Sequence, residues 1–250
     1  MREKYSTDLT DEQWAIIAPL FKCMRNRKWS KRDLVDAVLY LVDNGCKWRN
    51  LSHDFPPYST VHSFYRRARQ SGLWDKILQH LVEVTRTRAG SNPTYAIIDS
   101  QSVDTAYKSE QIGFDGGKKN KGHKRHIVTD SFGCLLAVKV HRANLHDTKA
   151  GIFPAVKAYR LYPTIKAFCA DAGYRRTFVS NVESILDLKI DISPKIKAAG
   201  FHVIPKRWVV ERTFAWFGNS RRRAFDFEKT IASQEAMIKI SHIHTLLKRL

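Results

Sequence analysis

Two short apolar runs that each end in an aspartate decide the fold of this chain. Residues 95–99 read Tyr-Ala-Ile-Ile-Asp, and residues 167–171 read Ala-Phe-Cys-Ala-Asp. A strand that ends in an acid places that acid at the rim of a sheet, where the ligand sites of open α/β sheets commonly lie. The sequence therefore predicts a sheet with Asp99 and Asp171 at one edge.

Two such acids on neighbouring strands would repel each other, and a divalent cation is the natural compensation. Each aspartate could instead belong to an ordinary turn, because Asp favours turns. A third acid, Glu211, borders the apolar stripe of a helix predicted over residues 208–217. It needs a partner, which is either a metal shared with the two aspartates or Arg207, one helical turn earlier.

The other segments after residue 90 alternate between strand and helix patterns. We predict strands over 125–129, 134–141, 164–170, 188–192 and 201–204, and helices over 147–159, 177–186 and 236–250. Three further acids have structural explanations. Asp130 lies in a hairpin turn, Asp147 begins a helix, and Asp104 is expected to lie beyond the end of the first strand.

The first 90 residues carry helical patterns only. In the helix predicted over 58–70, Val61, Phe64, Tyr65 and Ala68 form an apolar stripe, and the arginines at 66, 67 and 69 lie on the other face. Short helices with a basic helix after a tight turn indicate a helix-turn-helix-like DNA-binding domain. The alternative is a small helical bundle with solvated arginines. A linker at 90–94 divides the chain into domains 1–90 and 91–250.

The charge of the chain favours a polyanionic partner. There are 43 Lys and Arg against 24 Asp and Glu, a net charge of +19, and the excess extends over both predicted domains. No apolar run approaches the length of a membrane span, and no apolar segment follows the N-terminus. The four cysteines have no CxxC spacing, so we expect reduced thiols in a cytoplasmic protein.

Six ordered blocks make the chain resemble DDE transposases of the bacterial insertion-sequence-five family. The N-terminal block includes Leu-Thr-Asp-Glu-Gln-Trp at 9–14 and the segment 48–74. The other blocks are Asp-Ser-Gln-Ser-Val at 99–103, the basic hairpin at 116–126, Ala-Asn-Leu-His-Asp at 143–147, Ala-Asp-Ala-Gly-Tyr at 170–174, and residues 207–216.

This resemblance implies a ribonuclease-H-like catalytic domain with a mixed sheet, preceded by the all-α N-terminal domain. It implies that Asp99, Asp171 and Glu211 hold two Mg²⁺ ions, for which Mn²⁺ can substitute. The partners implied are the terminal inverted repeats of the element and a target DNA, which the enzyme cleaves and joins. A homo-oligomer, at least a dimer on DNA, and association with the bacterial nucleoid are also implied.

The superfamily signature is incomplete in this chain. Arg207 has its expected place before Glu211, but Ile204 and Gly218 replace the signature Tyr and Lys. Arg212 or the run 221–223 could supply the missing lysine contact. The cations that we expect to contact DNA are Arg66, Arg67, Arg69, Lys118, Lys119, Lys121, Lys124, Arg125, Arg207, Arg212, Arg221, Arg222 and Arg223.

Three other functions are compatible with part of this pattern. The first is a ribonuclease-H-like nuclease without strand transfer, and the second is a non-enzymatic DNA-binding protein derived from a transposase. The intact acid triad argues against the second. A zinc site at His123 and His126, or at His242 and His244, is weaker, because neither pair has Cys or carboxylate partners at suitable spacing.

Overall fold

The computed structural model describes residues 2–22, 24, 28–193 and 207–250. Internal contacts divide the chain into two compact units. The sheet unit comprises residues 86–216 and 226–235. The helical unit comprises residues 1–85, 217–225 and 236–250. The N-terminal helices therefore form one unit with two C-terminal segments, which the sequence assigned to the catalytic domain.

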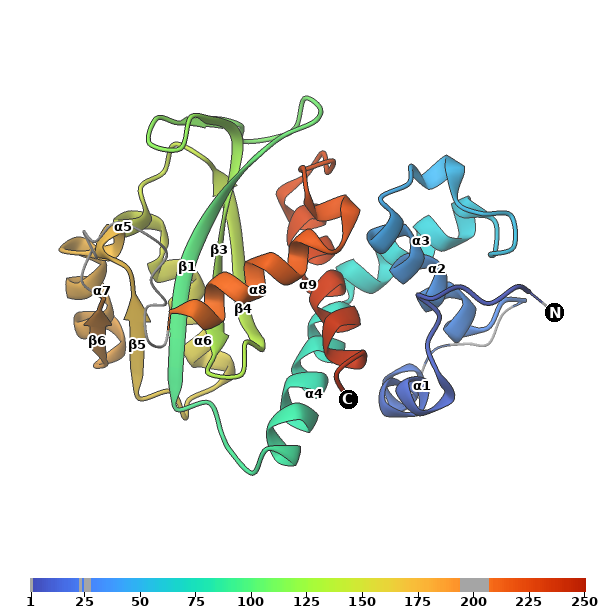
Figure 1. Ribbon diagram of the computed structural model, residues 1–250, viewed down its shortest axis with the longest axis horizontal. Coiled ribbons are helices and arrows are strands. Elements are labelled where there is room, and N and C mark those ends of the chain that lie inside the picture. The colour runs from blue at the N-terminus through green and yellow to red at the C-terminus, as the bar shows by residue number, and fades with distance from the viewer. Residues whose placement is uncertain (1, 23, 25–27, 194–206) are drawn as a thin grey trace. The chain divides into compact units, whose positions relative to one another are not determined.

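The sheet unit is built on one mixed sheet (Figure 1). Its strands are β1 (Tyr95–Asp104), β2 (Gly113–Asp115), β3 (Asn120–Asp130), β4 (Leu135–Arg142), β5 (Ala167–Ala170) and β6 (Lys189–Ile192). The order is β2-β3-β1-β5-β6, and β4 also pairs with β3. β3 is antiparallel to β1 and β4, whereas β5 and β6 run parallel to β1. The predicted mixed α/β class is confirmed, and this arrangement agrees with the expected ribonuclease-H-like domain.

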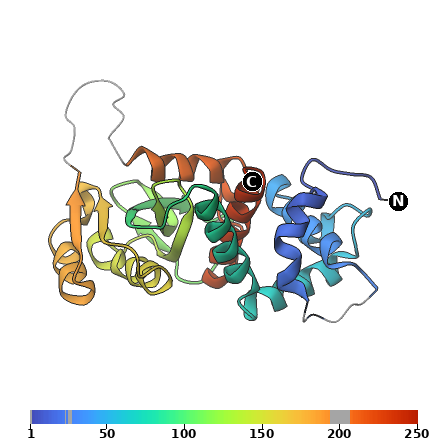
Figure 2. The same ribbon diagram turned by 90° about the horizontal axis from the view of Figure 1, so that it is seen from below.

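Helices cover both faces of this sheet. They are α5 (Asp147–Ala150), α6 (Ile152–Leu161), α7 (Thr177–Leu186) and α8 (Trp208–Gly218). Figure 2 shows α8 and α6 on opposite faces. The helical stretch predicted over 147–159 is present as α5 and α6, which meet at Gly151, a residue whose own backbone is helical. There the backbone lies so close to Tyr174 that an added Cβ would be 2.5 Å from the ring.

Strand β1 is longer than the sequence predicted. We expected the strand to end at Asp99, but its pairing with β3 continues from Asp99↔Ile127 to Asp104↔Gly122. The polar residues after Asp99 have little intrinsic preference for a strand, but pairing with the long antiparallel strand β3 holds them in one. Asp104 therefore lies within the strand rather than beyond it. Its side chain accepts a hydrogen bond from Asn120 Nδ2 at 3.0 Å. Asp104 is five residues beyond Asp99 along β1.

The helical unit contains the predicted N-terminal helices. They are α1 (Asp11–Ile17), α2 (Lys31–Asn44), α3 (Tyr58–Gln70) and α4 (Leu73–Arg88), with 3₁₀ turns at Ala18–Phe21, Trp48–Asn50 and Arg221–Arg223. Thr10 and Ser30 accept hydrogen bonds from the first turns of α1 and α2. Gly45 ends α2 in the left-handed conformation. The stripe predicted for α3 is the buried face of that helix.

The last helix, α9 (Ile231–Leu247), belongs mostly to the helical unit. Ile240, Ile243 and Leu247 are fully buried, so the stripe predicted over 236–250 packs in a core. Polar contacts reinforce this packing, because Lys239 Nζ lies 2.7 Å from an oxygen of Asp75 on α4. The burial explains why C-terminal residues join the N-terminal helices.

Three further predictions concern the strand at 201–204, membrane spans and the cysteines. Residues 201–204, predicted as a strand, lie outside the described residues, as does Ile204 of the signature. No helix in the described part of the chain is long and apolar enough to cross a membrane. Cys46, Cys134 and Cys169 are free thiols.

The close approach of β3 to β1 provides a test of the fold. A Cβ on Gly122 would lie 2.2 Å from the carbonyl oxygen of Val103, so the strand pairing must shift to accept it. We expect Gly122→Ala to lower the free energy of unfolding by roughly 1–3 kcal/mol. Gly116→Ala is the control, because no atom lies within 4 Å of its added Cβ. Equal stability of the two variants in urea unfolding would contradict this account.

Candidate active site

Asp99 and Asp171 lie side by side at one edge of the sheet. The parallel pairing of β1 with β5 brings Ile97 opposite Cys169, and each aspartate follows its member of that pair by two residues. Burial raises the pKa of Asp99 to about 6, and the charge of Asp171 also raises it, whereas Arg207 and Lys118 lower it. The two acids that the sequence placed at a sheet edge are therefore together and in electrostatic contact.

Local backbone groups fix the direction of both carboxylates. The amide of Ser100 donates to Asp99 Oδ1 at 2.7 Å. Asp171 caps a 3₁₀ turn (Ala172–Tyr174) and accepts from the Gly173 amide at 2.9 Å. The turn alternative considered from sequence is thus present at Asp171, and its capping role coexists with the approach to Asp99.

Arg207 joins the third acid, Glu211, to Asp99. Glu211 lies in the first turn of α8, and its side chain is 50% exposed. Arg207 Nη2 lies 3.3 Å from Glu211 Oε1 and 3.7 Å from Asp99 Oδ2. The ion-pair alternative for Glu211 is therefore present, and the same guanidinium also touches Asp99. Arg207 therefore links Glu211 to Asp99, and in the described residues the three acids are not grouped closely enough to hold one ion.

Sequence reasoning missed a further carboxylate, Asp147. It begins α5 as predicted, but its side chain reaches the aspartate edge. Asp147 Oδ1 accepts from Ser100 Oγ at 3.0 Å and lies 3.2 Å from Lys124 Nζ. The only sequence signal was its place at the end of the block 143–147, which a helix start seemed to explain.

A buried tyrosine and histidine lie beneath these acids. Tyr174 OH and His126 Nδ1 are 2.7 Å apart. Burial, followed by the charges of Asp99 and Asp147, raises the pKa of Tyr174 well above its usual value. Burial lowers the pKa of His126. Burial thus disfavours the charged form of each group in this pair.

The basic hairpin divides into exposed and buried cations. Lys118, Lys119 and Lys121 are exposed, and Lys118 Nζ donates to the carbonyl oxygen of Ser100 beside Asp99. Lys124 and Arg125 are buried, contrary to their predicted contact with DNA phosphates. They point to opposite faces of β3, and both faces are covered from Gly122 onward. Lys124 ion-pairs with Asp115 and Asp147, and Arg125 donates to Gln101.

Three of the arginines predicted to replace the signature lysine make contacts within the protein. Arg212 stacks between Trp208 and Trp216, at 4.4 and 4.6 Å from the ring centres. Arg222 and Arg223 are buried, which is a correction to their predicted role at DNA. Only Arg221 of that run is exposed. Trp208 is 42% exposed, so it is not a core residue.

The donor set of this site suits a hard divalent cation, although no preformed metal cage is present. Among the described residues, no three His, Cys, Asp or Glu side chains are grouped closely enough to hold an ion. Carboxylate oxygens are the ligands that Mg²⁺ and Mn²⁺ prefer. A Cβ on Gly173 would lie 2.9 Å from Asp171 Oδ1, so the absent side chain leaves space beside this carboxylate. Asp99 and Asp171 fit such an ion, and Glu211 would join them on leaving Arg207.

Comparison with known families agrees with this geometry. Residues 90–246 match the family described as "Transposase DDE domain". The chain belongs to this DDE transposase family. Residues 9–78 of the transposase match a second family, described as "Putative transposase of IS4/5 family". The resemblance inferred from the six sequence blocks is confirmed.

Two Burkholderia cepacia proteins are similar to this transposase. A protein described as "Putative transposase for insertion sequence element IS402" is 30% identical over 48% of this chain and 60% of its own length. The chain therefore matches less than two thirds of that relative. An uncharacterized 16.2 kDa protein of the same element is 25% identical over 42% of this chain and 78% of its own length.

Among solved structures, the Mos1 mariner paired end complex with Mn is similar at 12% identity. The alignment covers 90% of this chain and 78% of that one, with a TM-score of 0.33. A Mos1 transposase complex with the left transposon end gives 10% identity and a TM-score of 0.29. Similarity at this level supports no further inference about the transposase.

The bridge made by Arg207 can be tested through the pKa of Asp99. Arg207→Gln removes a positive charge that lowers this pKa, so we expect it to rise above about 6. A ¹³C NMR titration of the aspartate carboxyls would measure the change. Arg160→Gln on α6 is the control and should leave the pKa of Asp99 unchanged. An unchanged or lower value in Arg207→Gln would contradict the bridge.

Proposed function

We propose that this transposase binds the terminal inverted repeats of its element and catalyses metal-dependent DNA cleavage and strand transfer. The observation that supports this most is the pair Asp99 and Asp171, two half-buried acids side by side with Glu211 one guanidinium away. Repulsion between adjacent acids is costly unless a cation compensates it, so such a pair indicates a functional site rather than a stabilising one.

Two divalent ions, Mg²⁺ or Mn²⁺, would supply the chemistry that phosphodiester attack needs, by activating the nucleophile and stabilising the leaving oxygen. Asp99, Asp171 and Glu211 would hold them. The protein prepares this site in two ways. The amides of Ser100 and Gly173 orient the aspartates. Arg207 balances the charges of Asp99 and Glu211 in the absence of a metal ion.

Exposed cations near the site would guide the DNA backbone. Lys118, Lys119 and Lys121 project from the hairpin between β2 and β3, and Lys118 is anchored at the carbonyl of Ser100 beside Asp99. Lysines at this place can position a phosphate but carry no sequence information. Arg207 and Arg221 remain further candidates, whereas the buried cations of the sheet unit do not.

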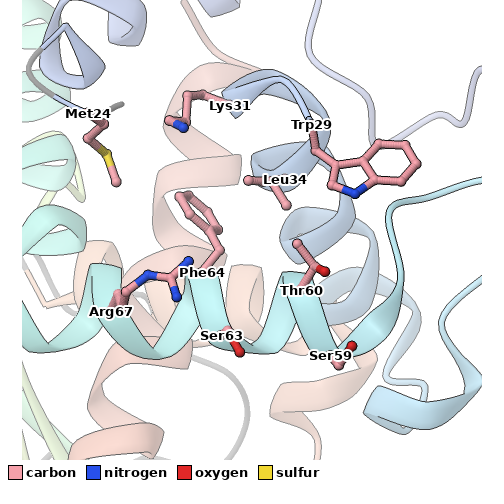
Figure 3. Close-up of a pocket in the computed structure, with 9 residues that line it drawn as sticks. All are labelled: Met24, Trp29, Lys31, Leu34, Ser59, Thr60, Ser63, Phe64 and Arg67. Atoms are coloured by element: carbon pink, nitrogen blue, oxygen red, sulfur yellow. The ribbon is translucent and has the colours of Figure 1, made fainter. Parts of the chain in front are cut away.

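The helical unit would recognise the ends of the element. Arg66 and Arg67 are exposed on α3, and Arg69 lies on the same helix, with its guanidinium 5.9 Å from the ring centre of Tyr65. A cavity of about 440 Å³ opens beside this helix (Figure 3). It is lined by Met24, Trp29, Lys31, Leu34, Ser59, Thr60, Ser63, Phe64 and Arg67. Its hydroxyls and cations are groups that hydrogen-bond phosphates and bases.

Two protomers at least would act together, because an element has two ends and one protomer provides one carboxylate site. The second candidate function is a nuclease that cuts without strand transfer. The same carboxylates would serve it, so only a joining assay separates the two.

Replacement of the acid triad tests the enzyme directly. Asp99→Asn, Asp171→Asn and Glu211→Gln keep the size of each side chain but remove its charge. We expect each alone to reduce Mg²⁺-dependent cleavage and joining by at least about a thousandfold, because residues that act as one unit are not additive. DNA binding and far-UV circular dichroism should stay nearly unchanged.

Asp104→Asn and Asp187→Asn are the matched controls for the triad. Asp104 is bonded to Asn120 at the far end of β1, and Asp187 is an exposed residue that ends α7 in the left-handed conformation, which Asn also adopts readily. Both variants should cleave as the wild type does. If the three triad variants retain strand chemistry, the proposed mechanism is wrong.

The basic face of α3 is tested by Arg66→Ala combined with Arg67→Ala. We expect weaker binding to DNA ends and a shallower dependence of the affinity on salt, because two phosphate contacts are lost. Lys76→Ala with Lys248→Ala removes the same charge from exposed positions on α4 and beyond α9. Binding isotherms at several salt concentrations would compare the two double variants. Equal slopes and equal affinities would exclude α3 from the DNA contact.

A further inference from the structure

The two oxygens of Asp147 have different surroundings. Oδ1 accepts from Ser100 Oγ at 3.0 Å and lies 3.2 Å from Lys124 Nζ and 3.5 Å from His126 Nε2. No described residue donates to Oδ2. The Asp147 side chain is 20% exposed, so this second oxygen is close to the surface of the site. Ser100 and Lys124 therefore hold one oxygen of the carboxylate and leave the other available.

The available oxygen faces Asp171. A Cβ placed on Gly173 would lie 2.9 Å from Asp171 Oδ1 and 3.6 Å from Asp147 Oδ2. Both carboxylates therefore border the same small space, which a side chain at position 173 would fill. Gly173 has no positive φ, so its backbone does not require glycine. Space rather than backbone conformation is what glycine provides here.

Helix capping does not explain the position of the Asp147 side chain. The N-cap of α5 is His146, whose ring accepts the hydrogen bond from the Thr148 amide. Asp147 Oδ1 instead points to Ser100 and Lys124 on the strands beneath. An acid at a helix start needs neither contact, so the bonds indicate another role.

A buried histidine nitrogen also points to Asp147. His126 is fully buried, and its Nε2 makes no hydrogen bond within the described part of the protein. It lies 3.5 Å from Asp147 Oδ1, while Tyr174 OH occupies the other ring nitrogen. Metal-binding carboxylates are commonly held by such outer hydrogen bonds, which direct the remaining oxygen at the ion.

The charge balance favours a bound cation. Asp99, Asp147 and Asp171 all act electrostatically on the phenol of Tyr174. Arg207 and Lys118 act on Asp99, whereas Asp147 has Lys124, which also ion-pairs with Asp115. Negative charge therefore remains in excess where Asp147 and Asp171 face each other.

We propose that Asp147 is a fourth carboxylate of the metal site, and that its Oδ2 shares one hard divalent cation with Asp171 Oδ1. This assignment rests on the proposed function, in which Asp171 holds such an ion. It makes Gly173 a residue whose absent side chain leaves room for the cation.

Manganese binding without DNA tests the assignment, with free Mn²⁺ measured by electron paramagnetic resonance. We expect Asp171→Asn and Asp147→Asn each to weaken binding by about tenfold to a hundredfold. Together they should weaken it by less than the product of the two single effects, because both ligands serve one ion. Asp187→Asn is the control with the same chemistry at an exposed site, and it should bind as the wild type does.

The outcomes separate the two proposals. If Asp171→Asn loses Mn²⁺ and Asp147→Asn binds it normally, Asp147 is not a ligand and the proposed function stands. If neither Asp99→Asn nor Asp171→Asn differs from the wild type, the metal site of the proposed function itself fails.

Gly173→Ala tests the shared space while keeping every carboxylate. It should lose Mn²⁺ affinity as Asp147→Asn does, and its melting temperature in EDTA should stay close to that of the wild type. This variant also covers the case in which Asp147→Asn does not fold. Normal Mn²⁺ binding by folded Gly173→Ala would overturn the proposal.

Discussion

The parallel pairing of β1 with β5 is the constraint on which the site depends. It carries Asp99 and Asp171 past the pair Ile97 and Cys169 to the same edge, where burial and mutual repulsion raise the pKa of Asp99. A sheet gains no stability from two adjacent, half-buried acids. Surrounding groups must therefore compensate the repulsion between these two acids.

Those groups come from separate parts of the sheet unit. Backbone amides of Ser100 and Gly173 hold the aspartates, and Arg207 bridges Asp99 to Glu211 from the start of α8. Lys124 reaches Asp147 from β3. Arg207 and Lys124 each contact two acids, so the acids of the site outnumber the cations that bind them.

Burial also decides which of the many basic residues can meet DNA. The net charge of +19 is a property of the whole sequence, but Lys124, Arg125, Arg222 and Arg223 are turned inward. Their charges serve internal acids, carbonyl groups and aromatic rings. The exposed lysines of the hairpin and the exposed arginines of α3 are left for a polyanion.

The sequence by itself determined the apolar strand segments that precede Asp99 and Asp171, the buried stripe of α3 and the family, because each depends on local spacing. It did not determine the full length of β1, the burial of Lys124 or the approach of Asp147 to Asp171. Each of these depends on a partner distant in the chain: β3 extends β1, Asp115 and Asp147 pair with Lys124, and Ser100 holds Asp147. Local patterns carry no information about such partners, so only the tertiary structure could decide them.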